Sequence, residues 1–109
     1  MGLIVQKFGG SSVKDRDRIF NVARIVMNTR NAGHDVVVVV SAQGDTTDDL
    51  ITKAAEITSD PSHREMDMLL AAGEEISISL LTMALQELGV SAISLTGWQA
   101  GFNTDRAYS

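Results

Sequence analysis

The sequence predicts an α/β domain with a parallel sheet, and three observations indicate this class. Short apolar segments over residues 3–8, 36–40 and 91–96 have the length of strands. Longer segments with apolar residues at helical spacing separate them, so strands and helices alternate along the chain. Residues 36–40 are five consecutive valines, which is typical of a strand buried on both faces of a parallel sheet.

The first half of the chain has a strand, a turn and a helix in clear succession. Leu3 to Phe8 is predicted to be the first strand, and a turn of two glycines and two serines follows it. The next helix is expected to end at Gly33, before the valine strand. Its predicted core residues are Ile19, Val22, Ala23 and Val26.

The second half is predicted to be helical up to a third strand at residues 91–96. A short helix is expected from about Thr47 to Ser59, with Thr47 or Asp48 as its cap, and Pro61 ends this region. Residues 64–89 form the next helical segment, in which Gly73 predicts two helices or a kink. The predicted buried side of that segment consists of Leu69, Gly73, Ile76, Leu80, Met83 and Leu88.

Length and composition restrict the class of protein. A chain of 109 residues suits one small domain, and 44% hydrophobic with 21% charged residues is typical of a soluble globular protein. The net charge of −5 disfavours nucleic-acid binding, because no basic stripe is present to neutralise a phosphate backbone. The absence of cysteine excludes disulfides and thiolate metal sites. With no signal peptide and no long apolar run, we expect a cytoplasmic protein without a membrane partner.

The end of the chain predicts a larger domain. A three-stranded parallel sheet with so few helices leaves its faces and edges poorly covered. The sequence stops shortly after the third predicted strand, in a turn-rich tail without a closing helix. We therefore expect the N-terminal piece of a larger domain, and a complete small domain is the alternative.

Glycine, serine and threonine follow each predicted strand, where a parallel sheet places ligands. The first strand ends in Lys7 and the glycine-serine turn, in which glycine lets the main chain approach a ligand and hydroxyl groups donate hydrogen bonds. The spacing differs from a P-loop and from the G-x-G-x-x-G fingerprint, because the lysine precedes the glycines. A phosphate site is predicted; an ordinary turn with a solvated lysine is the alternative. The other two clusters are Ser41, Gly44, Thr46 and Thr47, and Thr96, Gly97 and Gly101.

In order and spacing, four segments resemble successive motifs of the aspartate kinases of the amino-acid kinase family. They are "VQKFGGSSV", "VVVVSAQGDTTDDL", "REMDMLLAAGEEIS" and "SLTGWQAGF". Glutamate, acetylglutamate and uridylate kinases share the early lysine-glycine turn but are less similar in the last two segments. The resemblance implies a three-layer α/β/α fold with a mainly parallel sheet. Residues 1–109 would be the N-terminal portion of the catalytic domain, without the later nucleotide segments and regulatory domains.

The resemblance also implies an activity and site residues. The activity is transfer of the γ-phosphoryl group of ATP, bound with Mg²⁺, to the β-carboxylate of L-aspartate, the first step toward lysine, threonine and methionine. Lys7 would be catalytic and would stabilise negative charge on the transferred group. Matching ATP phosphate-binding positions are Lys7, Phe8, Gly9, Gly10 and Ser11. Matching aspartate-site positions are Ser41, Thr47 and Glu74, of which Glu74 would pair with the α-ammonium group.

Several expectations accompany this assignment. No metal ligand is expected in this chain, since His34 and His63 have no partner at ligand spacing. The parent protein is expected to form a homo-oligomer or a hetero-oligomer with a regulatory subunit, and the isolated chain is expected to be inactive. Two positions depart from the family pattern: Gln43 replaces a common methionine, and Glu75 replaces the usual arginine. Alternatives are a non-catalytic phosphate-binding or assembly module of the same fold, and a related amino-acid kinase.

Overall fold

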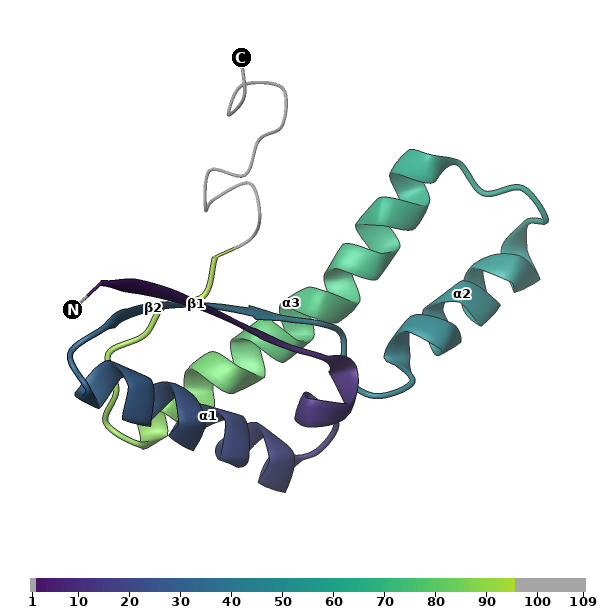
Figure 1. Cartoon of the computed structure of the whole chain (residues 1–109). Helices are drawn as coiled ribbons and strands as arrows, with labels where there is room; N and C mark the ends of the chain where they lie inside the picture. The colour runs from purple at the N-terminus through teal and green to yellow at the C-terminus, as the bar shows by residue number, and fades with distance from the viewer. Residues whose placement is uncertain (1, 96–109) are drawn as a thin grey trace, which may run out of the picture.

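The computed structural model describes residues 2–95, which form a parallel strand pair with helices (Figure 1). The predicted α/β class is confirmed. In chain order the elements are β1 (Leu3–Phe8), the 3₁₀ helix η1 (Gly10–Val13), α1 (Arg16–Asn31), β2 (Asp35–Val40), α2 (Thr46–Ile57) and α3 (His63–Glu87).

The two strands pair in parallel, and their register places the ends of both strands side by side. Leu3 lies opposite Asp35, and Phe8 lies opposite Val40. Even-numbered residues of both strands point toward the helices, because Phe8, Val36 and Val38 pack against the core. The two loops that follow the strands therefore start at the same edge of the sheet.

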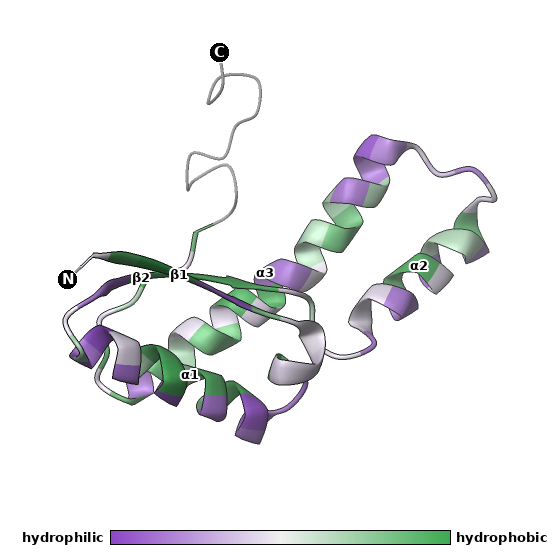
Figure 2. Ribbon diagram, viewed as in Figure 1, coloured by the Kyte–Doolittle hydropathy of each residue, from purple (hydrophilic) through white to green (hydrophobic). Residues whose placement is uncertain are grey.

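The core lies between the sheet and the helices α1 and α3, which cover the same face (Figure 1). The predicted core residues of α1 are all buried, and Gly33 has a φ of 99° just after the helix, as expected of a helix-ending glycine. Figure 2 shows that β2 and the C-terminal part of α3 are mainly hydrophobic. The buried cluster consists of Val13, Ile19, Val22, Ala23, Val26, Val40, Leu81, Ala84 and Leu85.

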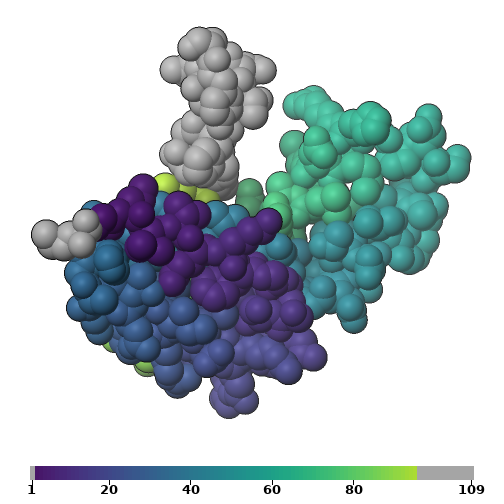
Figure 3. Space-filling model, in the orientation of Figure 1, coloured from purple at the N-terminus to yellow at the C-terminus, as the bar shows by residue number. Residues whose placement is uncertain are grey.

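The helix α2 and the N-terminal part of α3 form an arm that projects beside this body (Figures 1 and 3). No residue of α2 is buried, and its packing is against α3. The cap of α2 is Asp45, so the predicted cap at Thr47 or Asp48 is wrong by two or three positions. Ser62 caps α3 by accepting a hydrogen bond from the Glu65 backbone N–H at 3.3 Å.

The valine strand is buried on one face, so the prediction of burial on both faces is not met in residues 2–95. Val36, Val38 and Val40 face the helices, while Val37 and Val39 are 37% and 42% exposed. On β1, Leu3 and Val5 are exposed beside them, at 66% and 63%. A continuous apolar run shows that a strand tolerates burial on both sides, but it does not show which layers cover it.

Two predictions for α3 are wrong. One helix runs from His63 to Glu87 instead of two, because the propensity cost of one glycine, about 1 kcal/mol, is small for a helix of this length. Ile76, Leu80 and Met83 of the predicted buried side are exposed. The helix is apolar around most of its circumference, so packing against α1 and β2 selects the buried side. That side consists of Gly73, Ser77, Leu81, Ala84 and Leu85.

The predicted third strand does not form within the described residues. Ser91 to Leu95 has no strand pairing, and the sheet of residues 2–95 has only β1 and β2. Thr96 and the predicted loop with Gly97, Trp98 and Gly101 lie outside the described residues.

One described helix, α3, has the length and apolar composition of a membrane span. Core helices of soluble proteins often share this property, and α3 contributes Leu81, Ala84 and Leu85 to the core. The helix is therefore only a weak indication of a membrane.

Candidate functional site

The loops that follow β1 and β2 are joined by hydrogen bonds at one edge of the sheet. The backbone N–H of Ser41 donates to the carbonyl oxygen of Phe8 at 3.1 Å, which extends the strand pairing by one step. The N–H of Gly44 donates to the carbonyl oxygen of Gly10 at 2.9 Å. The predicted phosphate-binding turn and the loop that carries Ser41 are therefore in direct contact.

Gly10 is the glycine that this contact requires. A Cβ atom at Gly10 would collide with the carbonyl oxygen of Ala42 and would lie 3.3 Å from the N atom of Gly44. Gly9 has open space around it and a φ of −77°, so it needs no special backbone angle. Neither glycine has a positive φ. Gly10 instead allows two backbone segments to approach each other closely.

Lys7 lies on the sheet face that is opposite to α1 and α3. It pairs in register with Val39, and its side chain is exposed. The neighbouring Phe8 points to the other face and packs against the core. Ser11 is exposed on η1, directly after Gly10. Of the predicted phosphate-binding residues, Phe8 therefore anchors the start of the turn to the core, whereas the side chains of Lys7 and Ser11 are accessible to solvent.

The N-terminus of α2 lies at the same edge and has no side-chain cap. The side chain of Asp45 makes no hydrogen bond to the first turn, in contrast to Asp15 on α1 and Ser62 on α3. Thr47 is exposed in this first turn. A helix N-terminus carries unpaired N–H groups and partial positive charge, which favour an anion.

Glu74 is linked to this edge through its neighbour Gly73. A Cβ atom at Gly73 would lie 3.1 Å from Leu50 Cδ1, 3.2 Å from Ala42 Cβ and 3.4 Å from Thr46 Cγ2. The absence of a side chain thus lets α3 approach the β2–α2 loop closely. Glu74 is exposed beside this contact, and Glu75 is exposed at the next helix position, about 100° further around the axis.

A groove of about 640 Å³ runs between β2, α3 and residues 90–95. Glu74 lines it, but Glu75, Lys7 and Ser41 do not. The groove lies along the edge of β2 that has no strand partner within residues 2–95. We interpret it as an unpaired strand edge rather than as a ligand cavity, since unpaired backbone groups line such an edge.

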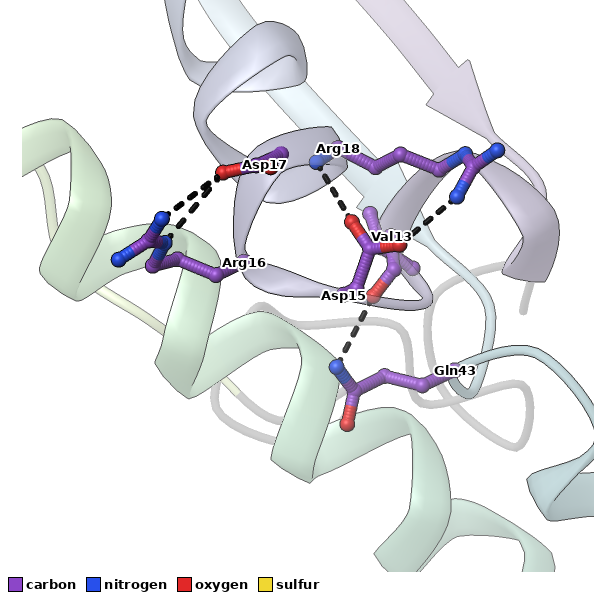
Figure 4. Close-up of polar contacts among 6 residues, drawn as sticks. All are labelled: Val13, Asp15, Arg16, Asp17, Arg18 and Gln43. Carbon is purple, nitrogen blue, oxygen red and sulfur yellow. Dashed lines mark hydrogen bonds and ion pairs between the residues drawn. The ribbon is translucent and has the colours of Figure 1, made fainter.

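The charged residues beyond η1 pair mainly with one another (Figure 4). Asp15 accepts a hydrogen bond from the Arg18 backbone N–H at 2.9 Å, and its other oxygen lies 2.7 Å from the Arg18 guanidinium group. The backbone N–H of Arg18 is the main cause that holds the pKa of Asp15 below its usual value; burial opposes this effect, and the guanidinium group of Arg18 adds to it. Asp17 pairs with Arg16 at 3.3 Å. These pairs define the start of α1.

One residue of the joined loops was not predicted as part of the site. Gln43 donates from Nε2 to the carbonyl oxygen of Val13 at 2.9 Å (Figure 4). In the sequence Gln43 is only a departure from the family pattern, because hydrophobic spacing carries no information about a loop-to-loop hydrogen bond.

The parallel strand pair and its joined loops define an α/β protein with glycine and hydroxyl residues at one sheet edge. The model of the amino acid kinase family matches residues 2–109, and the chain belongs to this family.

Within the family, the chain is similar to aspartokinases. It is 58% identical to the aspartokinase of Bacillus sp. (strain MGA3) over 108 residues, which cover 99% of this chain and 26% of that protein. It is 58% identical to aspartokinase 2 of Bacillus subtilis (strain 168) over 105 residues, which cover 96% of this chain and 26% of that protein. The chain therefore spans about a quarter of the length of these relatives.

A solved structure supports the same relationship. The crystal structure of aspartate kinase from Synechocystis matches with a TM-score of 0.81 and 53% sequence identity, over 84% of this chain and 16% of that chain. The resemblance to the aspartate kinases that the four motifs indicated is confirmed by these comparisons.

Proposed function

We propose that residues 1–109 are the N-terminal portion of the catalytic domain of an aspartate kinase. The complete protein would transfer the γ-phosphoryl group of ATP to the β-carboxylate of L-aspartate. The observation that carries the proposal is the direct contact between the turn after β1 and the loop after β2, through Gly10 and Gly44. High identity to aspartokinases over nearly the whole chain supports it.

The turn after β1 would bind the phosphate groups of ATP. Gly9 and Ser11 are exposed at the strand end on either side of the half-buried Gly10, and Lys7 adds a positive charge. Phosphoryl transfer needs little covalent chemistry from a protein and depends on positioning and on charge stabilisation. The ammonium group of Lys7 would stabilise the negative charge on the phosphoryl group during transfer.

The loop after β2 and the middle of α3 would bind aspartate. Ser41 and Thr47 would donate hydroxyl hydrogen bonds to a carboxylate, and the uncapped first turn of α2 favours the same charge. Glu74 would accept a charge-assisted hydrogen bond from the α-ammonium group. Glu75 projects from another side of α3, so its negative charge need not oppose the substrate.

Mg²⁺ would enter as part of the ATP complex. Among residues 2–95, no three carboxylate or imidazole side chains gather at one point. When bound, the ion would neutralise phosphate charge. A cytoplasmic location, an oligomeric parent protein and a place early in lysine and threonine biosynthesis complete the proposal.

Replacing Lys7 in the full-length gene product tests the catalytic role. Lys7→Ala should lower the kcat of aspartate-dependent ADP formation by roughly 100-fold or more, as is typical when a charge-stabilising group is removed. Lys53→Ala, which removes an exposed lysine in the middle of α2, is the matched control and should change kcat less than twofold. A normal rate in Lys7→Ala would contradict the role of Lys7.

The same assay separates the kinase from a non-catalytic module of the same fold. If the full-length wild-type protein forms no ADP with aspartate but still binds ATP, the non-catalytic module is favoured. Residues 1–109 alone are expected to be inactive, since the sheet face that carries Lys7 is uncovered in the described residues. A normal turnover rate of the isolated chain would contradict that expectation.

A further inference from the structure

Gln43 makes the side-chain hydrogen bond that connects the two loops within residues 2–95. Its Nε2 atom donates to the carbonyl oxygen of Val13 at 2.9 Å (Figure 4). Val13 is the last residue of η1 and is fully buried, and carbonyl groups at a helix end lack partners within the helix. Gln43 is half-buried, so the bond is partly shielded from water.

The backbone of Gln43 continues the connection to α2. Its carbonyl oxygen accepts a hydrogen bond from the N–H of Thr46 at 2.8 Å, at the first residue of the helix. One residue therefore links η1 to the turn that places Thr47. A movement of either loop would have to break or stretch a bond to Gln43.

The other loop contacts do not depend on a side chain. The bonds from Ser41 to Phe8 and from Gly44 to Gly10 join backbone atoms. Gly10 also permits the close approach of Ala42 because it has no side chain. These contacts allow the loops to meet. The hydrogen bond from Gln43 to Val13 adds a third connection between them, and this one depends on a side chain.

We propose that Gln43 is a positioning residue that fixes the distance between the glycine-serine turn after β1 and the segment after β2 that carries Ser41 and the first turn of α2. This inference rests on the proposed function, in which these two loops bind the two reactants. Transfer is fast only when the reacting atoms are held about 3–3.5 Å apart in the correct orientation. Loss of the bond should therefore reduce kcat while each reactant still binds to its own loop.

The test uses the full-length protein with Gln43→Leu, which replaces the amide by an apolar side chain of similar size and so removes the donor. Gln86→Leu is the matched control, because Gln86 Nε2 also donates to a backbone carbonyl, that of Ala92, at 3.1 Å near the end of α3. Gln43→Leu should lower kcat about fivefold, the factor for one ordinary hydrogen bond, with KM for aspartate and ATP changed less than twofold. Gln86→Leu should leave kcat unchanged.

Hydrogen exchange provides a measurement that does not need activity. The amide of Gly44 should exchange about fivefold faster in Gln43→Leu, with unchanged protection of α1 and α3. Unchanged exchange at Gly44, or a rise in KM with kcat unaffected, overturns the inference. If the wild-type protein has no aspartate-dependent activity, the proposed function fails. The exchange result then still decides whether Gln43 holds the two loops together.

Discussion

The Cβ atom of Ala42 lies 3.2 Å from the position that a Cβ atom on Gly73 would occupy. Ala42 cannot move away freely, because Ser41 before it donates a hydrogen bond to Phe8 and Gly44 after it donates one to Gly10. The close packing of α3 against the β2–α2 loop thus depends on a glycine in the middle of a long helix.

Replacing Gly73 by alanine should not stabilise the protein, although alanine favours a helix by about 1 kcal/mol. The new methyl group would press on Ala42 and Leu50, and we expect this strain to offset the gain. Denaturant unfolding measures the result. Ala72→Gly, on the exposed side of the same turn, is the control and should lose about 1 kcal/mol. An increase of about 1 kcal/mol in the free energy of unfolding of Gly73→Ala would show that the contact with Ala42 and Leu50 is not tight.

The two adjacent glycines of the turn should differ in their tolerance of alanine. Gly10→Ala places a methyl group against the carbonyl oxygen of Ala42 and should lower the free energy of unfolding by about 1–3 kcal/mol. Gly9→Ala meets open space at an ordinary φ and should change it by less than about 0.5 kcal/mol. Thermal unfolding of the two variants makes the comparison, and equal effects would disprove the steric explanation.

Ser77 is fully buried, and its hydroxyl group has no hydrogen-bond partner among the described residues. Ser77→Ala should therefore keep or raise the free energy of unfolding, by up to about 1 kcal/mol, because an unpaired buried polar group is removed. Ser62→Ala is the matched control, because it removes a serine hydroxyl group that does have a partner, at the cap of α3. It should lower the free energy of unfolding by about 1 kcal/mol. A clear loss of stability in Ser77→Ala would mean that its hydroxyl group has a partner in solution.

Asp15 should make the stability of α1 depend on pH in the acid range. Its pKa is lowered in the folded protein, so its stabilising effect is complete above the ordinary aspartate pKa of 3.8. The effect is lost as the pH falls through the lowered value, because the protonated side chain caps α1 less well. Asp15→Ser keeps a capping oxygen without a charge, so the Tm difference from wild type should shrink as the solution is acidified. A difference that is constant from neutral pH to strong acid would contradict this explanation.

The sequence predicted β1, α1 and β2 well because each is locally distinct: α1 has apolar residues at helical spacing, and the strands are short apolar runs bounded by glycine or polar residues. The third strand was not found in Ser91 to Leu95, since pairing depends on a neighbouring strand rather than on the segment itself. The buried side of α3 was assigned wrongly for a related reason. Ile76 and Leu81 are equally apolar, and only the positions of α1 and β2 decide which of them is buried.

At the candidate site, the meeting of the first two strand ends followed from parallel pairing. Sequence reasoning therefore placed Lys7, Gly10, Ser41 and Thr47 at one edge, and the pairing and loop contacts confirm that the first two loops meet there. The distinct roles of Gly9 and Gly10 could not be predicted, because they depend on the path of the neighbouring loop past Ala42. Gln43 was missed for the same reason, since its acceptor is thirty positions away in the chain.

Lys7 shares its sheet face with Leu3, Val5, Val37 and Val39, all of them apolar and exposed in the described structure. Any layer that packs onto those four side chains would displace water next to the ammonium group. Coulomb attraction grows as the local dielectric constant falls, so the same lysine would attract a phosphate more strongly once this surface is covered. Covering this sheet face would then also strengthen the attraction between Lys7 and a phosphate group.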